Sequence, residues 1–150
     1  MERARLAQTD DRAACARLLD EVRDGARAMR GGAALLGPET TETLIERWNG
    51  PRTGLFVGEY EGAVVGLLAV SLNERVAGRV RGLIECCYVE PDARGVGVGS
   101  SLMEAAVAWG QDQGCTDLDA LALPGDRQTK QRFEAAGFTA RLLTLSRRLD

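Results

Sequence analysis

A glycine-rich turn between an apolar strand and a helix constrains this chain more than any other feature. Residues 89–100 read VEPDARGVGVGS, with glycines at positions 95, 97 and 99. Glycines at these spacings remove side chains where the backbone bends, and they leave successive N–H groups exposed at the positive end of a helix. With the Ser100 hydroxyl beside them, these groups suit a phosphate or pyrophosphate. A plain tight turn is the alternative, but each glycine costs backbone entropy on folding, and a turn needs fewer of them.

The segments around this turn predict a mixed α/β chain. Apolar spacing predicts helices over about 10–30, 40–49, 98–113 and 127–136. Strands are expected over 3–6, 54–60, 63–72, 79–89 and 117–123, and one bent strand or two short ones over 138–149. The three central strands are joined at 61–62 and 73–78 and form an antiparallel meander. We therefore expect one domain over residues 1–150, with a single mixed, largely antiparallel sheet flanked by helices.

Composition narrows the possible functions. A chain of 150 residues can bury a core without disulfides or metal ions to stabilise it. The excess of Asp+Glu (22) over Lys+Arg (19) makes DNA, RNA and anionic membranes poor partners. The chain has no histidine, which excludes His-based metal sites and Ser-His-Asp or Cys-His catalysis, so we expect no metal. No apolar run reaches the roughly 18 residues of a membrane span, and the charged N-terminus lacks a signal-peptide stretch. Four cysteines without a C-x-x-C pair indicate reduced thiols and a cytoplasmic protein.

Three phosphate-binding patterns can be compared with the turn. The P-loop requires a lysine after its glycines, and none follows here. The dinucleotide fingerprint G-x-G-x-x-G requires a third glycine where Ser100 stands, and a parallel βαβ unit, whereas the preceding strands look antiparallel. The third pattern, [QR]-x-x-G-x-[GA] after a strand, is satisfied by Arg94, Gly97 and Gly99.

On this segment the chain resembles the GNAT superfamily of N-acetyltransferases. VEPDARGVGVGSSLM is similar to that family's acyl-CoA pyrophosphate loop, FEAAGF (133–138) is similar to its closing signature, and the element order fits nearly the whole chain. The resemblance implies an N-acetyltransferase that moves an acetyl group from acetyl-CoA, its co-substrate, to a primary amine by direct attack. A small-molecule amine is favoured over a protein N-terminus or lysine. The residues it implies for acetyl-CoA binding are Val89, Arg94, Gly95, Val96, Gly97, Val98, Gly99, Ser100, Asp126 and Phe133.

The strand before the turn carries one carboxylate, Glu85, in the apolar run 83–89. A charge in such a run is costly unless it faces a cleft or finds a partner. Family members often place here a Glu that contacts the acceptor or deprotonates it through water, so the resemblance makes Glu85 the candidate general base. An ion pair with an arginine of a neighbouring strand is the alternative. The resemblance also assigns the backbone N–H of Val89 to the oxyanion.

The chain departs from the family where many members have a tyrosine that protonates the departing thiolate, because Phe133 stands there; a frequent Asn is replaced by Asp126. Water or another residue protonates the sulfur, or the thiolate leaves unprotonated. Otherwise the chain is a non-catalytic acyl-CoA-binding or sensing module, which is our alternative function. Tyr88 is a candidate acid, but strand alternation places it opposite Glu85.

Three further surfaces are interpreted from the sequence. Acidic residues of the first two helices suit a cationic acceptor, although exposed acids usually serve solvation. The segment 127–132, with Lys130, is a candidate for the nucleotide 3′-phosphate or else a solvated helix face. Leu142, Leu143 and Leu145 are candidates for pairing across a homodimer.

Overall fold

The computed structural model describes residues 1–149, with the side chains of residues 74–76 left aside. Its strands are β1 (Glu2–Leu6), β2 (Thr53–Tyr60), β3 (Ala63–Val76), β4 (Arg79–Val89) and β5 (Asp117–Ala120). Its helices are α1 (Arg12–Arg27), α2 (Gly32–Leu36), α3 (Thr41–Trp48), α4 (Val98–Asp112) and α5 (Arg127–Ala135), with 3₁₀ turns at Thr9–Asp11 and Pro91–Ala93. The strands form one sheet in the order β1-β2-β3-β4-β5. The expected α/β class with one mixed sheet is confirmed.

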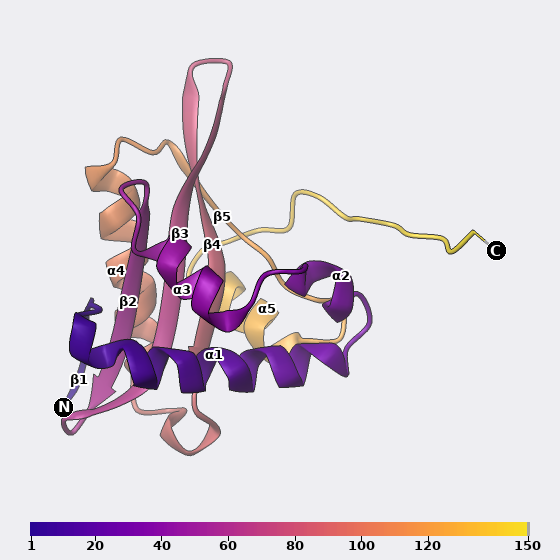
Figure 1. The fold of residues 1–150 in the computed structure, drawn as a ribbon. Helices are drawn as coiled ribbons and strands as arrows, with labels where there is room; N and C mark the ends of the chain where they lie inside the picture. Colours follow the sequence, from indigo (N-terminus) through magenta and orange to yellow (C-terminus); the bar gives the residue numbers. More distant parts are fainter. Residues whose placement is uncertain (150) are drawn as a thin grey trace.

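Both faces of the sheet are buried. The first four strands pair antiparallel and β5 joins β4 in parallel, while α1 and α3 cover one face and α4 and α5 the other (Figure 1). Successive residues of one strand enter different cores: Leu67 and Ala69 pack with α1 and α3, whereas Leu68 and Val70 pack with α4. Double burial explains why the central strands read as continuous apolar runs rather than alternating ones.

A β-bulge in β4 changes the alternation at Glu85. Cys86 pairs with Ala69 and Ile84 pairs with Val70, so Glu85 is an extra residue without an opposite number in β3. Consequently Ile84 lies in the core under α4 and Cys86 in the core under α1 and α3, although they are two residues apart. The bulge therefore turns both Glu85 and Cys86 toward the α1/α3 face.

Several boundaries differ from those expected. β3 continues to Val76, so the turn expected over 73–78 shrinks to Ala77–Gly78, where both residues have positive φ. The five-residue helix α2 forms where glycines predicted only a loop, α1 ends at Arg27, and β5 ends at Ala120. The prediction of strand structure over 138–149 was wrong, because these residues form none. Arg141 still bonds to Asp119 of β5 (2.9 and 2.7 Å), and the end of the segment runs away from the sheet (Figure 1). An alternating pattern becomes a strand only where its backbone groups find a partner.

Candidate active site

The N-terminus of α4 presents unpaired backbone amides. Gly97 caps this helix at φ +90° and Gly95 precedes it at φ +87°, left-handed conformations that favour glycine. The Ser101 amide makes the first bond of the helix, to the Gly97 carbonyl (3.0 Å). The amides of residues 98–100 thus come before the first intrahelical bond and point out of the helix end. This geometry suits an anion.

A cation lies beside Gly99 in the first turn of α4. A Cβ at Gly99 would lie 3.3 Å from the Arg132 Nε, so the absence of a side chain there lets the guanidinium of α5 approach the end of α4. Gly99, Ser100, Met103 and Arg132 help to line a groove of about 470 Å³ between α4 and α5. The segment 127–132, with Lys130, was the candidate for the nucleotide 3′-phosphate; the residue of this segment that lies beside Gly99 is Arg132.

β4 has an open edge beside this helix end. The last β5 pair is Ile84 with Ala120, so in the described chain β5 pairs with no β4 residue beyond the bulge. The Glu90 amide bonds to the Val65 carbonyl of β3 (2.9 Å). Because amides alternate between the two sides of an antiparallel strand, the Val89 amide points to the open side.

Arg94 also reaches this edge instead of the α4 amides. Its Nε donates to the Val89 carbonyl (3.0 Å) and its Nη1 donates to Gln128 Oε1 (2.8 Å). The guanidinium carbon lies 5.8 Å from the centre of the Tyr88 ring. Arg94 therefore links the loop to the end of β4 and the start of α5.

Asp126 and Phe133 occupy structural positions. The Asp126 carboxylate caps α5 by accepting from the Thr129 amide (3.2 Å) and hydroxyl (2.6 Å). Phe133 is 6% exposed and packs with Phe138, with 5.3 Å between ring centroids, in the core under α4. In these positions Asp126 caps the N-terminal end of α5, and Phe133 packs in the core against the sheet.

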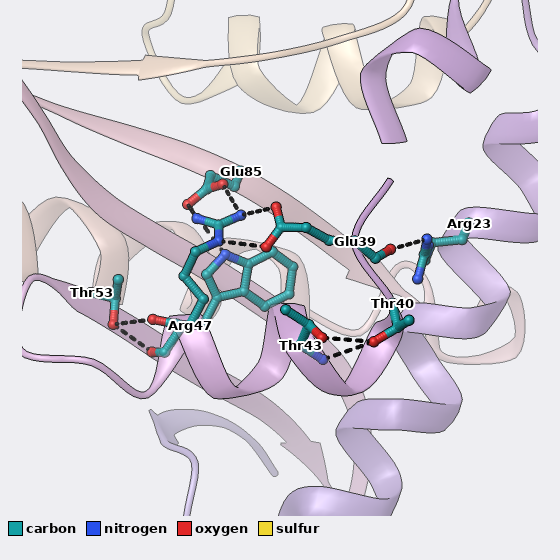
Figure 2. Close-up of polar contacts among 8 residues, drawn as sticks. Arg23, Glu39, Thr40, Thr43, Arg47, Thr53 and Glu85 are labelled. Carbon is teal, nitrogen blue, oxygen red and sulfur yellow. Dashed lines mark hydrogen bonds and ion pairs between the residues drawn. The ribbon is translucent and has the colours of Figure 1, made fainter. Parts of the chain in front are cut away.

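Glu85 projects from the bulge toward the C-terminal end of α3, where three donors hold its carboxylate (Figure 2). Arg47 Nη1 donates to Oε2 (3.1 Å), Arg47 Nη2 donates to Oε1 (3.0 Å), and Trp48 Nε1 donates to Oε2 (3.2 Å). The alternative expected from the sequence was an arginine partner on a neighbouring strand. The arginine that pairs with Glu85 lies on α3 instead. No local pattern identifies Arg47 or Trp48 as partners of a strand residue that lies 38 and 37 positions away.

Tyr88 shares this face with Glu85, so the prediction that they lie on opposite faces was wrong. It assumed a regular strand, and the bulge at Glu85 reverses the alternation. The Tyr88 hydroxyl donates to Glu21 Oε2 of α1 (3.0 Å). Burial and this hydrogen bond raise the pKa of Tyr88, which keeps the phenol protonated.

The four cysteine thiols are held in their protonated, weakly nucleophilic form. Burial raises the pKa of the Cys15 thiol to about 11 and also raises the pKa of the thiols of Cys86, Cys87 and Cys115. Within residues 1–149, no group of three Cys, Asp or Glu side chains is placed to hold a metal ion. None of the described helices has both the length and the apolar character that spanning a bilayer requires.

The open edge of β4 and the N-terminus of α4 together give this α/β chain a place that suits an elongated anionic ligand. The model of the acetyltransferase (GNAT) family matches residues 17–138. The chain belongs to this family, and the resemblance identified from the sequence is confirmed.

Individual relatives agree with this assignment. The aminoglycoside N(6′)-acetyltransferase type 1 of Stenotrophomonas maltophilia is 39% identical over 57 residues, which are 38% of this chain and 37% of that protein. The chain thus matches little more than a third of the length of this curated relative. The structure of a tetramutant of the BH1408 protein from Bacillus halodurans superposes with a TM-score of 0.81 at 16% identity, over 97% of this chain and 99% of that one. An aminoglycoside N-acetyltransferase, AAC(6′)-Iy, solved in complex with CoA, gives a TM-score of 0.74 at 18% identity, over 99% and 96% of the two chains.

Proposed function

We propose that this protein transfers an acetyl group from acetyl-CoA to a primary amine of a small molecule. The observation that carries the proposal is the open edge of β4, which ends at Val89 directly before the loop to the α4 amides. A pyrophosphate on the amides of residues 98–100 would place the attached chain along this edge. Arg132 would add a positive charge to the same anion.

The residues of the chain support direct attack by the amine. The outward-pointing Val89 amide would stabilise the negative charge that develops on the thioester oxygen. The N–C bond forms as the C–S bond breaks, the amine proton passes through water to Glu85, and CoA leaves as a thiolate. An acyl-cysteine is disfavoured because burial raises the pKa of the thiols and keeps them protonated.

Phe133 cannot donate a proton, and departure of the thiolate does not require a proton donor at that position. An ordinary thiol pKa near 8.5 makes the thiolate a fair leaving group, and water can protonate it afterwards. The Tyr88 hydroxyl, the other candidate donor, is engaged by Glu21. Turnover is the property that separates this function from the alternative, a non-catalytic acyl-CoA-binding module.

The favoured acceptor is a small cationic amine. The printed name of the Stenotrophomonas relative supports this choice, since an aminoglycoside is a small molecule bearing several amines. On the α1/α3 face many acids are already paired within the chain: Glu39 and Glu85 with Arg47, and Asp20 with the Thr41 hydroxyl. This pairing weakens the case for a strongly acidic pocket and favours selection by shape and a few hydrogen bonds.

The C-terminal segment supports the proposal of a homodimer. Leu142, Leu143, Leu145 and Leu149 are between 75% and 91% exposed, and burying such side chains against a second copy is favourable. Light scattering after gel filtration should show a dimer for the full chain and a monomer for a Leu143→Ser/Leu145→Ser variant. A monomer at all concentrations for the full chain would contradict it.

We further propose that the chain forms a single domain. Its four free thiols suit the reducing environment of the cytoplasm, which we propose as its location.

Thermal unfolding with and without acetyl-CoA tests the function first. Ligand at about 100 times Kd adds roughly 2.7 kcal/mol, which raises Tm by several degrees at this size. NADH and ATP are the controls, and a rise with NADH, or none with acetyl-CoA, refutes the proposal. A panel of amines, from kanamycin to simple alkylamines, then tests turnover through release of the CoA thiol; binding without turnover would favour the alternative function.

The role of Glu85 has its own test. Glu85→Gln should lower kcat/KM about 100-fold, with the greatest loss at low pH, where little free amine exists. An unchanged pH–rate profile would exclude Glu85 as the base.

A further inference from the structure

Arg47 joins two carboxylates from distant parts of the chain with both edges of its guanidinium. Nη1 and Nη2 donate to Glu85 on β4 (3.1 and 3.0 Å), while Nε and Nη2 donate to Glu39, just before α3 (3.1 and 3.3 Å). Four of the five N–H groups of the side chain are thus engaged. Such paired, charge-assisted bonds fix orientation as well as distance.

Trp48, the next residue, adds a third donor to Glu85. Its indole Nε1 shares Oε2 with Arg47 Nη1, and the Arg47 guanidinium carbon lies 6.0 Å from the centre of the Trp48 ring. A carboxylate has roughly four acceptor positions, and Arg47 and Trp48 together occupy three of them in Glu85. The one left is on Oε1, which among the described residues accepts only from Arg47 Nη2.

The end of α3 is itself anchored. The Thr53 hydroxyl donates to the Trp48 carbonyl (2.6 Å), and the side-chain Nδ2 of Asn49 donates to the Ile45 carbonyl (2.7 Å). Trp48 is 3% exposed, whereas 42% of the Arg47 side chain is exposed. A buried indole and an anchored helix end hold Arg47 in place at a surface that solutes can reach.

We propose that Arg47 is a positioning residue of the acceptor site, which with Trp48 aligns Glu85 so that one lone pair of Oε1 faces the water or amine it deprotonates. The inference rests on the proposed function only for the identity of the reaction. Glu39 lies along the adjacent Nε–Nη2 edge of the guanidinium and shares Nη2 with Glu85. Its loss would leave in place both bonds from Arg47 to Glu85 and the bond from Trp48. Asp119 of β5, another acid near this strand, is held by Arg81 (3.0 Å) and Arg141 (2.7 Å), so it does not compete for Arg47.

The first test needs no substrate. The chain has two tryptophans, Trp48 and Trp109, and Trp48→Phe assigns their indole N–H signals in a ¹H–¹⁵N spectrum. Arg47→Gln should speed water exchange of the Trp48 indole proton about tenfold, because its carboxylate acceptor is no longer held. Glu39→Gln, the matched control, should change it by less than about twofold. No change in Arg47→Gln, or an equal change at Trp109, would overturn the proposal, since the latter indicates a general loss of structure.

The second test separates positioning from a structural role. With the best amine of the panel, Arg47→Gln should lower kcat about 10- to 100-fold and leave KM for acetyl-CoA within about threefold. In a Glu85→Gln background the same substitution should change kcat by less than about threefold, because the residue it acts through is gone. Equal losses in both backgrounds, or full activity of Glu85→Gln, would overturn the inference. If no amine is acetylated, the proposed function fails and the indole exchange alone decides the role of Arg47.

Discussion

Gly97→Ala tests whether the amides of α4 hold acetyl-CoA. Gly97 is the N-cap of this helix at φ +90°, where an alanine is strained whatever the space around it. Its Cβ would also lie 3.1 Å from Glu2 Cγ. A left-handed conformation costs an L-residue about 1–2 kcal/mol, which at this chain length lowers Tm by about 2–8 °C.

The same strain should reach the ligand. To relieve it, residue 97 must shift, and the amides that follow it then lose their common direction. Losing one hydrogen bond to a charged phosphate costs about 1.5–3 kcal/mol, which weakens Kd for acetyl-CoA roughly 10- to 100-fold.

Gly62→Ala is the matched control. Gly62 has φ +83° in the turn between β2 and β3, and a Cβ there would meet no atom within 4 Å. Both variants should lose about the same free energy of unfolding in urea, because both carry the same backbone strain. Only Gly97→Ala should lose affinity in a calorimetric titration with acetyl-CoA; an equal Kd in the two variants would refute an anion site at these amides.

Three further predictions concern single side chains. Arg132→Gln should weaken acetyl-CoA binding about three- to tenfold in calorimetry at low salt, and less at high salt, whereas Arg127→Gln on the same helix should not. Arg5 holds the pKa of the buried Asp11 below its ordinary value of 3.8, so this stability is present at neutral pH and is lost as pH falls through the lower folded value. Asp11→Asn should therefore cost about 3 kcal/mol in urea at pH 7, and a cost that did not shrink toward pH 3 would contradict it. Tyr88→Phe should keep kcat within about threefold, because the Tyr88 hydroxyl already donates its hydrogen bond to Glu21; a loss of tenfold or more would identify Tyr88 as the acid.

The features that were predictable from the sequence are those set by nearby residues. The loop 94–100, the helix that follows it and the β2–β3 hairpin depend on glycine positions, apolar spacing and turn residues within about 20 positions. The candidate anion site was predictable for the same reason, since glycines and a helix start carry its geometry.

The features that were missed depend on distant parts of the chain. No local pattern reveals that Glu85 is an extra residue, because a bulge is defined by what stands opposite it in β3. The partnership of Arg47 with Glu85 likewise requires α3 to lie across the sheet. The wrong prediction of a strand over 138–149 shows the converse: its alternation was real, but within the described chain no neighbouring strand accepts it.

The bulge at Glu85 also explains why the two halves of the candidate site meet. Pairing with β5 ends at Ile84, directly before the extra residue, so the open edge of β4 begins where the strand bends. The same residue moves Glu85 and Cys86 to one face, and from there the alternation points the Tyr88 side chain toward α1 and the Val89 amide toward the open edge. One inserted residue thus places a carboxylate on the acceptor face and a free amide on the ligand edge within five positions of a single strand. Deleting Glu85 would remove the carboxylate and the bulge together and restore regular pairing of β4 with β3, so both features depend on the same inserted residue.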